Sequence, residues 1–297
     1  MRTKPWWAAL CAVGMASGGA AETLTLATYN VENYGPADRM TAEGFRAAYP
    51  KPEAEKAALR AAIRALGADV LALQEMGQAP HLEELRRDLR GEGMDYPYAA
   101  LLEAEDGARR LAVLSRRPFE VVPHPDLAIA LRGGPGRVKR GLLEVRLGAG
   151  LAVFAVHLKS RLDEAGDDPE GARRRAAEAA AVRDCVRREF PDPEAGRYVI
   201  MGDCNDGPGS PALRRLTTAG GRRIAWPLPA ADSRGEIWTE AWRRGGLYSE
   251  FDYILVSPAL RAAVRGGTAR IYDGPETAAA SDHRPVVAVL ELTSPKR

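Results

Sequence analysis

The sequence predicts an α/β protein of the mixed (α+β) type, in which mixed sheets carry helices on their outer faces. Two observations predict this fold. Some predicted strands follow one another through short turns, whereas helices separate other strands. The composition is that of a globular chain, because 45% of the 297 residues are hydrophobic and 28% are charged. No internal repeat and no linker rich in Pro, Gly or Ser divides the chain, so we expect one domain.

The first residues have the composition of a secretory signal peptide. Arg2 and Lys4 precede the apolar run Trp6–Val13, and a stretch of small residues follows. The run is shorter than the roughly 20 apolar residues that a membrane-spanning helix needs. We therefore expect a cleaved signal peptide at 1–21, a single domain at 22–297, and a periplasmic or secreted bacterial protein. An uncleaved membrane anchor is the alternative.

Hydrophobic periodicity and turn residues assign the elements in chain order. Helices are predicted at Glu53–Leu66, which a glycine follows, at Leu82–Leu89 and at Glu170–Phe190. Strands are predicted at Leu24–Asn30, Val70–Leu73, Leu111–Leu114, Leu142–Leu147, Leu151–Leu158, Tyr198–Met201, Phe251–Val256 and Val286–Leu292. Long loops, which often carry function, are predicted at Val31–Lys51, Leu131–Arg137 and Leu216–Glu236.

The charge balance excludes a bulk polycation, because 42 Lys and Arg residues face 40 Asp and Glu residues. Any binding of nucleic acid must therefore come from a local basic patch. One candidate patch consists of Arg132, Arg137, Lys139, Arg140, Lys159 and Arg161. A solvated run of charges is the alternative. The run Arg173–Arg175 is interpreted as a solvated helix face in preference to a phosphate-binding strip.

Cys185 and Cys204 are interpreted as two buried small residues, although export would also allow a disulfide between them. His81 and His124 match no motif and are expected at the surface. The tryptophans of the late part of the chain are expected in the core, with stacking on nucleic-acid bases as the alternative; they are Trp226, Trp238 and Trp242.

Polar residues stand where the apolar strands end. The first strand ends at Asn30, and the strand at Val70–Leu73 runs into Gln74 and Glu75. The later strands adjoin His157, the Asp203–Asp206 segment and Ser281–Arg284. Strand ends that meet at one sheet edge form a rigid rim for chemistry, so we expect these side chains to converge.

The same residues form motifs that resemble the endonuclease/exonuclease/phosphatase superfamily, whose fold is deoxyribonuclease I-like. The motifs are Thr28–Glu32, Leu73–Glu75, Val156–Leu158, Gly202–Asn205, Phe251–Ile254 and Ser281–Pro285. The resemblance implies a four-layer α/β/β/α sandwich of two packed mixed β-sheets flanked by helices. It also implies hydrolysis of a phosphoester with a divalent metal.

The resemblance implies a metal site of oxygen ligands. Glu75 matches the main metal carboxylate, and Asn30 stands beside it. Asp282 resembles a second acid that binds the metal or positions water, and Glu32 falls where some members carry a metal-side aspartate. Oxygen ligands without clustered thiols suit Mg²⁺ or Mn²⁺, and Ca²⁺ is a further possibility.

The resemblance also implies the catalytic roles. His283 looks like the general base, and Asp252 resembles the carboxylate that orients its ring. Asp203 and Asn205 resemble the pair that positions the nucleophile and binds a phosphate oxygen. His157 matches a second histidine that binds phosphate or protonates the leaving group; without the motif it would be interpreted as a half-buried structural histidine.

For the substrate, the basic cluster favours nucleic acid, with Arg140 and Lys159 as candidate substrate-binding residues. We expect a monomeric nuclease with no stable membrane insertion after signal cleavage. Phosphatases and sphingomyelinase-like hydrolases of the same superfamily are alternatives, as is a catalytically silent binding module. A lipid hydrolase should expose an apolar hairpin or an aromatic tip, and we expect none between the motifs.

Overall fold

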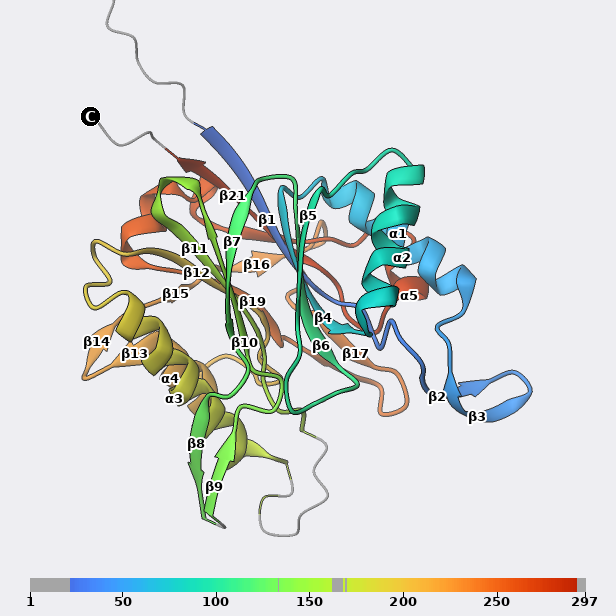
Figure 1. Cartoon of the computed structure of the whole chain (residues 1–297), viewed down its shortest axis with the longest axis horizontal. Coiled ribbons are helices and arrows are strands. Elements are labelled where there is room, and N and C mark those ends of the chain that lie inside the picture. The colour runs from blue at the N-terminus through green and yellow to red at the C-terminus, as the bar shows by residue number, and fades with distance from the viewer. Residues whose placement is uncertain (1–21, 133, 162–167, 169, 293–297) are drawn as a thin grey trace, which may run out of the picture.

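The computed structural model describes residues 22–132, 134–161, 168 and 170–292 (Figure 1). The signal peptide expected at 1–21 lies outside the described residues. Within the described ranges, no helix is long and apolar enough to span a membrane.

Two large mixed sheets form the centre of the molecule. The first has seven strands in the spatial order β16 (Ala230–Ala231), β20 (Ala269–Ile271), β21 (Val286–Leu292), β1 (Glu22–Asn30), β4 (Val70–Met76), β6 (Arg110–Ser115) and β5 (Tyr98–Leu102). The second has six strands in the order β15 (Trp226–Pro227), β19 (Asp252–Val256), β12 (Arg197–Asp203), β11 (Leu151–His157), β10 (Leu142–Leu147) and β7 (Phe119–His124). β1 runs parallel to β4, and β11 runs parallel to β12, while their other neighbours are antiparallel.

The inward faces of the two sheets make one hydrophobic core. Leu26 of β1, Val70 of β4 and Val153 of β11 are fully buried there. Complete burial of an aliphatic side chain of this size contributes about 1.5–3 kcal/mol. Because alternate residues of a strand point to opposite faces, the next residues along, such as Ala27 and Phe154, are buried against helices instead.

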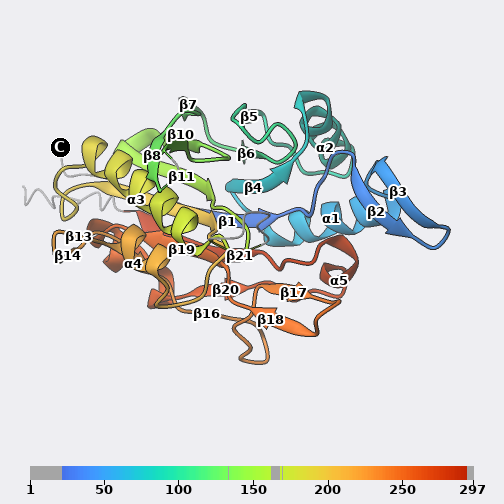
Figure 2. The same cartoon turned by 90° about the horizontal axis from the view of Figure 1, so that it is seen from below.

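Helices cover both outer faces, so the molecule has four layers (Figure 2). α1 (Glu53–Leu66) and α2 (Ala79–Gly91) pack on the seven-stranded sheet, and α3 (Ala172–Glu189) and α4 (Pro211–Thr217) pack on the six-stranded sheet. The predicted α/β/β/α sandwich is thus confirmed.

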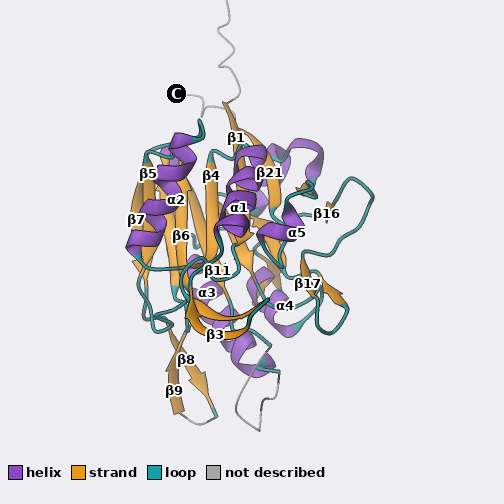
Figure 3. Ribbon diagram, turned by 90° about the vertical axis from the view of Figure 1, so that its right-hand side faces the viewer, coloured by secondary structure: helices purple, strands orange, loops and turns teal. Residues whose placement is uncertain are grey.

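Short two-stranded hairpins and turns surround the sandwich, and Figure 3 shows several of them at its lower edge. The hairpins are β2 (Ala37–Thr41) with β3 (Gly44–Tyr49), β8 (Ala128–Leu131) with β9 (Gly134–Arg137), β13 (Thr218–Ala219) with β14 (Arg222–Arg223), and β17 (Glu240–Trp242) with β18 (Leu247–Ser249). The remaining short elements are α5 (Thr277–Ala280) and the 3₁₀ turns Gly148–Gly150, Pro258–Ala263 and Arg265–Gly267.

The prediction of long loops at Val31–Lys51, Leu131–Arg137 and Leu216–Glu236 was wrong in part, because these segments hold the short strands β2 and β3, β9, and β13 to β16. Most strands of these hairpins bury no face completely, so their sequences lack the alternation that marks a half-buried strand.

Several predictions for single residues can be compared with their burial. Cys185 and Cys204 are free and buried, as expected. Trp226 packs against the core, but Trp242 is 52% exposed, so its core assignment was wrong. Arg175 is 1% exposed, which contradicts its assignment to a solvated helix face.

His124 is half-buried and engaged with the protein, in contrast to the expected surface position. Its Nε2 is 2.9 Å from Glu144 Oε2, and its Nδ1 is 3.6 Å from Cys185 Sγ. These contacts raise the pKa of His124 to about 9, the contact with Cys185 first and that with Glu144 second. A lone histidine on an edge strand gave no sign of these partners, which come from β10 and α3.

Candidate active site

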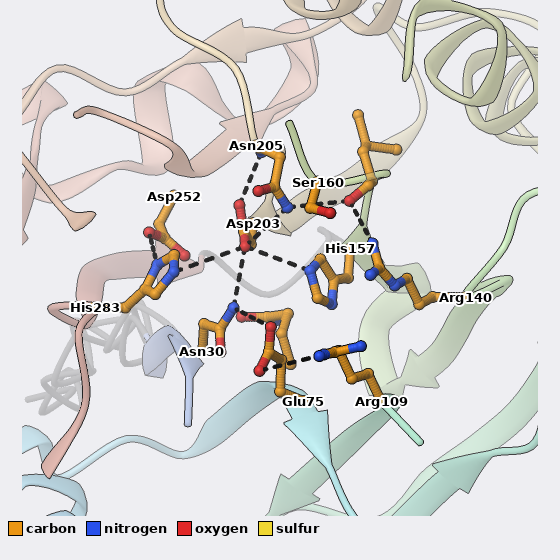
Figure 4. A network of polar contacts seen from close by, with 12 residues as sticks. Asn30, Glu75, Arg109, Arg140, His157, Ser160, Asp203, Asn205, Asp252 and His283 are labelled. Carbon is orange, nitrogen blue, oxygen red and sulfur yellow. Dashed lines mark hydrogen bonds and ion pairs between the residues drawn. The ribbon is translucent and has the colours of Figure 1, made fainter. Parts of the chain in front are cut away.

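The ends of five central strands bring the polar motif residues together at one rim (Figure 4). The parallel pair β1 and β4 carries Asn30 and Glu75 to the same end of the first sheet. In the second sheet, register pairs His157 of β11 with Asp203 of β12, and Asp203 with Asp252 of β19. The predicted convergence is therefore confirmed for these residues.

Glu75 lies at an irregularity of β4. The pairing of β4 with β6 shifts register between Leu73 and Met76, and Glu75 itself has φ +62°. This conformation turns its carboxylate toward the rim, where Oε2 accepts a hydrogen bond from Asn33 N (3.0 Å). Asn30 Nδ2 lies 3.4 Å from Glu75 Oε1.

Non-glycine residues with positive φ are concentrated at this rim. The described residues of this kind are Glu32, Asn33, Ala48, Glu75 and Asn205. All except Ala48 belong to the motif segments or adjoin them. The left-handed region is uncommon for residues other than glycine, so the backbone of the rim is fixed by its surroundings.

Asp203 is at the centre of the network. Its Oδ2 accepts hydrogen bonds from Asn30 Nδ2 (3.0 Å) and Asn205 Nδ2 (3.1 Å), and its Oδ1 accepts one from Asn205 N (2.8 Å). The preceding residue must be glycine, because a Cβ at Gly202 would lie 1.9 Å from the carbonyl oxygen of Val156. Burial, followed by the charge of Asp252, raises the pKa of Asp203 to about 7.

His283 and Asp252 form a buried pair. His283 Nδ1 is 2.8 Å from Asp252 Oδ2, and His283 Nε2 is 3.9 Å from Asp203 Oδ2. Burial lowers the pKa of His283, but the carboxylates of Asp252 and Asp203 outweigh it, so the pKa lies well above its usual value. Two hydroxyls fix the pair: Ser281 Oγ accepts from His283 N, and Thr239 Oγ1 accepts from Asp252 N.

His157 has the opposite electrostatic environment. Its Nε2 lies 3.4 Å from Asp203 Oδ2, and its buried Nδ1 has no hydrogen-bond partner among the described residues. Burial and the positive charge of Arg140 hold the pKa of His157 well below its usual value. The imidazole is therefore neutral at pH 7.

Glu32 and Asp282 neighbour each other beside this network. Asp282 N donates to Glu32 Oε2 (3.1 Å), and Lys51 Nζ donates to the Glu32 carbonyl (3.3 Å). Burial, with the charge of Asp282, raises the pKa of Glu32 to about 7. In the part of the chain that the structure describes, no hydrogen bond or ion pair connects either carboxylate with Glu75.

Two of the three residues expected to bind substrate, Arg140 and Lys159, are largely engaged with the protein itself; the third, Asn205, bonds to Asp203 and to the carbonyl of Leu158. Arg140 Nε donates to Asp106 Oδ2 (3.0 Å), and its Nη1 donates to the carbonyl of Leu158 (2.8 Å). Lys159 Nζ donates to the carbonyl of Ser160 (3.1 Å), and its side chain lines a cavity behind the rim.

Sequence reasoning missed Arg109 and Thr239. Arg109 Nε lies 3.8 Å from Glu75 Oε2, and Thr239 is completely buried beneath Asp252. Arg109 lies in the turn before β6 and Thr239 just before β17, and neither position stands out by periodicity or spacing. Ser281 was part of a predicted motif, but no role could be assigned to its hydroxyl.

The carboxylate of Glu75 is a hard oxygen donor that fits a divalent cation. Asn30 directs its Nδ2 toward Glu75, and its Oδ1 accepts a hydrogen bond from Glu32 N (3.0 Å). Asp203, Asp252 and His283 form a second acidic group, with ligand atoms within 4.8 Å of one another. The hydrogen bond between His283 and Asp252 explains why the ligand atoms of this second group lie so close together.

Several solved structures have a similar fold. The structure is similar to that of sphingomyelinase C from Streptomyces griseocarneus (TM-score 0.60, 18% identity, covering 91% of this chain and 99% of that one). It is also similar to an endonuclease/exonuclease/phosphatase from Bacteroides vulgatus (TM-score 0.62, 17% identity, 91% and 99% covered). A third similar structure is a beta toxin variant from Staphylococcus aureus with bound magnesium ions (TM-score 0.59, 17% identity, 90% and 99% covered).

These identities establish a shared fold. Among curated proteins, no sequence matches this chain significantly. The model of the endonuclease/exonuclease/phosphatase family, however, matches residues 27–283, which include every motif from Asn30 to His283. The chain therefore belongs to the endonuclease/exonuclease/phosphatase family.

Proposed function

We propose that this protein is an exported, divalent-metal-dependent phosphodiesterase that cleaves nucleic acid. One observation carries the hydrolytic part of this proposal: the Asp252–His283 pair meets Asp203, Asn30 and Glu75 at a single rim. The family consists of phosphoester hydrolases, and the imidazole, carboxylate and amide groups at this rim are of the types that such chemistry uses.

Each of these residues has a separate role in the proposed hydrolysis. Asp252 holds the Nδ1 proton of His283, and Nε2 is directed toward Asp203. The raised pKa makes His283 a stronger base, and its neutral form accepts a proton from water at Nε2. Asp203 and Asn205 fix the direction from which that water attacks phosphorus. A Mg²⁺ or Mn²⁺ ion bound by Glu75 and Asn30 would neutralise charge on the phosphate.

His157 serves the phosphate side of the reaction. As a neutral imidazole beside Asp203, it can donate a hydrogen bond to a phosphate oxygen or to the leaving oxygen. Arg109 and Arg140 add positive charge on the same side, since both lower the pKa of His157. This arrangement stabilises the negative charge that develops during attack.

Nucleic acid is favoured as the substrate because cationic side chains lie at the rim. Arg161 lies over the ring of Phe251, with its guanidinium carbon 4.7 Å from the ring centroid. Arg109 is partly exposed beside Glu75. Such positive groups attract a polyanion even when the whole protein is close to neutral.

Nicking of supercoiled plasmid by the mature protein tests this proposal. We expect cutting with Mg²⁺ or Mn²⁺, no cutting with EDTA, and no cutting by His283→Ala. A folded wild-type protein that leaves DNA and RNA intact in the presence of either metal would refute the nuclease assignment. Detection of the protein in the periplasm or medium, with its N-terminus after residue 21, would test export.

A lipid phosphodiesterase is a second candidate, and one observation favours it. Contrary to the sequence analysis, an apolar hairpin is exposed: Trp242 is 52%, Leu247 57% and Tyr248 65% exposed on β17 and β18. This hairpin adjoins the site, because Glu240 pairs with His283. An aromatic tip of this kind suits a bilayer interface.

Sphingomyelin vesicles distinguish the two candidates. The lipid assignment expects release of phosphocholine and its loss in a Trp242→Ser, Tyr248→Ser variant, whose plasmid nicking should remain unchanged. The nuclease assignment expects no hydrolysis of the vesicles by either protein.

A further inference from the structure

A basic cavity lies behind the rim, between the β8–β9 hairpin, α3 and α4. Its volume is about 800 Å³. Six cationic side chains line it: Arg132, Lys139, Lys159, Arg173, Arg174 and Arg215. The single acidic residue among the described lining is Asp168. Figure 1 shows the hairpin extending beside the end of α3, which agrees with their direct contact.

The acidic residue offsets only part of this charge, because Asp168 Oδ1 lies 4.0 Å from Nε of a single lining cation, Arg173. The carboxylate of Asp168 accepts hydrogen bonds from the backbone N–H groups of Arg173 and Arg174, both at 3.1 Å, in the first turn of α3. Arg132, Lys139 and Arg215 have no acidic group within 4.0 Å anywhere in the described part of the chain. Among the described residues, these three positive charges at the cavity therefore have no counterion.

A buried carboxylate fixes the wall of the cavity that lies nearest the active site. Glu178 of α3 accepts hydrogen bonds from Lys139 N (3.2 Å) and Lys159 N (2.8 Å), and Arg174 Nε lies 3.3 Å from it. Glu178 thereby holds two lysine-bearing segments side by side. The positions of these cations are set by the fold and not by a freely moving surface loop.

The cavity is also continuous in sequence with the catalytic rim. Lys159, which lines the cavity, follows His157 by two residues, a span of at most about 7 Å. The carbonyl of Leu158 between them binds Asn205 and Arg140, so this connection is firmly held. A polyanion held at His157 can therefore extend toward the cavity.

We propose that this cavity binds the phosphate backbone of a nucleic-acid strand beyond the bond that is cleaved. This inference rests on the proposed nuclease function and adds a second, non-catalytic subsite to it. Several cations spread over four segments of the chain suit a chain of phosphates better than one phosphate group. Apolar lining by Leu131, Pro135 and Pro211 leaves room for sugar or base contacts.

A double variant, Lys139→Gln with Arg215→Gln, tests the subsite. Binding of a fluorescent 20-nucleotide strand is measured by anisotropy with Mg²⁺ present, in a His283→Ala background that prevents cleavage. We expect roughly tenfold weaker binding, and a salt dependence whose slope falls by about 1.4, or 0.7 for each lost phosphate contact. Arg188→Gln is the matched control, because Arg188 is exposed at the other end of α3.

Hydrolysis of bis(4-nitrophenyl) phosphate by the corresponding active proteins separates the subsite from catalysis. This small diester carries a single phosphate and no backbone beyond the cleaved bond, so its kcat/KM should not change in the double variant. Unchanged strand binding by the double variant would overturn the inference. So would competition by tripolyphosphate as effective as that by the strand, which would assign the cavity to a small phosphate.

The inference and the proposed function fail in different ways. If the wild-type protein cleaves nucleic acid and the double variant binds it equally well, only the subsite is refuted. If the strand binds through the cavity but no phosphodiester is hydrolysed, only the nuclease function is refuted.

Discussion

The two histidines of the rim occupy opposite electrostatic environments although both approach Asp203. His283 faces carboxylates, and its pKa is raised; His157 faces Arg140 and has an orphaned Nδ1, and its pKa is lowered. One side of the site is therefore suited to take up a proton, and the other to face an anion without adding charge. Two residues of the same type acquire different chemistry from their neighbours alone.

Among the variants of the two histidines, His283→Ala should lower the activity most. We expect His283→Ala to lower kcat by about 10³–10⁴-fold, since the proton acceptor is lost. Asp252 acts through His283, so Asp252→Asn should cost less, and the double variant should be no slower than His283→Ala. Plasmid nicking rates measure all three. A double variant far slower than His283→Ala would show that Asp252 has a separate role.

Replacement of His157 should lower the activity less than replacement of His283. His157→Gln retains a hydrogen-bond donor, and we expect kcat to fall by about 10²-fold or less. Retention of the wild-type circular dichroism spectrum and melting temperature serves as the control for folding. A loss as large as that of His283→Ala would indicate that the two sides of the site share one role.

His124 provides a reference outside the active site, with the smallest expected effect. Its pKa rises from 6.5 to about 9 in the folded protein, so its contacts stabilise the fold fully below about pH 6.5. This contribution disappears as the pH rises through 9. We expect His124→Gln to melt about 2–4 °C below the wild type at pH 6.5 and close to it at pH 10. An equal difference at both pH values would contradict a charged His124.

The fold was predictable from sequence wherever an element buries a complete face. The predicted bounds of α1, β10 and β21 agree with the structure, because apolar residues recur there with the period of the element. The hairpins β8–β9 and β17–β18 were not predicted. Most of their residues contact solvent, so their sequences need not alternate between apolar and polar residues.

The site shows the same limit. Asp203, His283 and Glu75 belong to recognisable motifs, whereas Arg109 and Thr239 contribute through single contacts that only tertiary structure creates. No periodicity marks such residues. The same is true of the basic cavity, whose cations come from four separate segments of the chain.

The positive φ angles of Glu32 and Glu75 have a consequence for evolution of the fold. A non-glycine residue in the left-handed region costs about 1–2 kcal/mol, a substantial part of a net stability that is typically about 5–15 kcal/mol. Glycine at either position would relieve that strain, but it would also remove a carboxylate from the rim. Selection for stability and selection for the reaction therefore favour different residues at these two positions, and the chain retains the less stable choice.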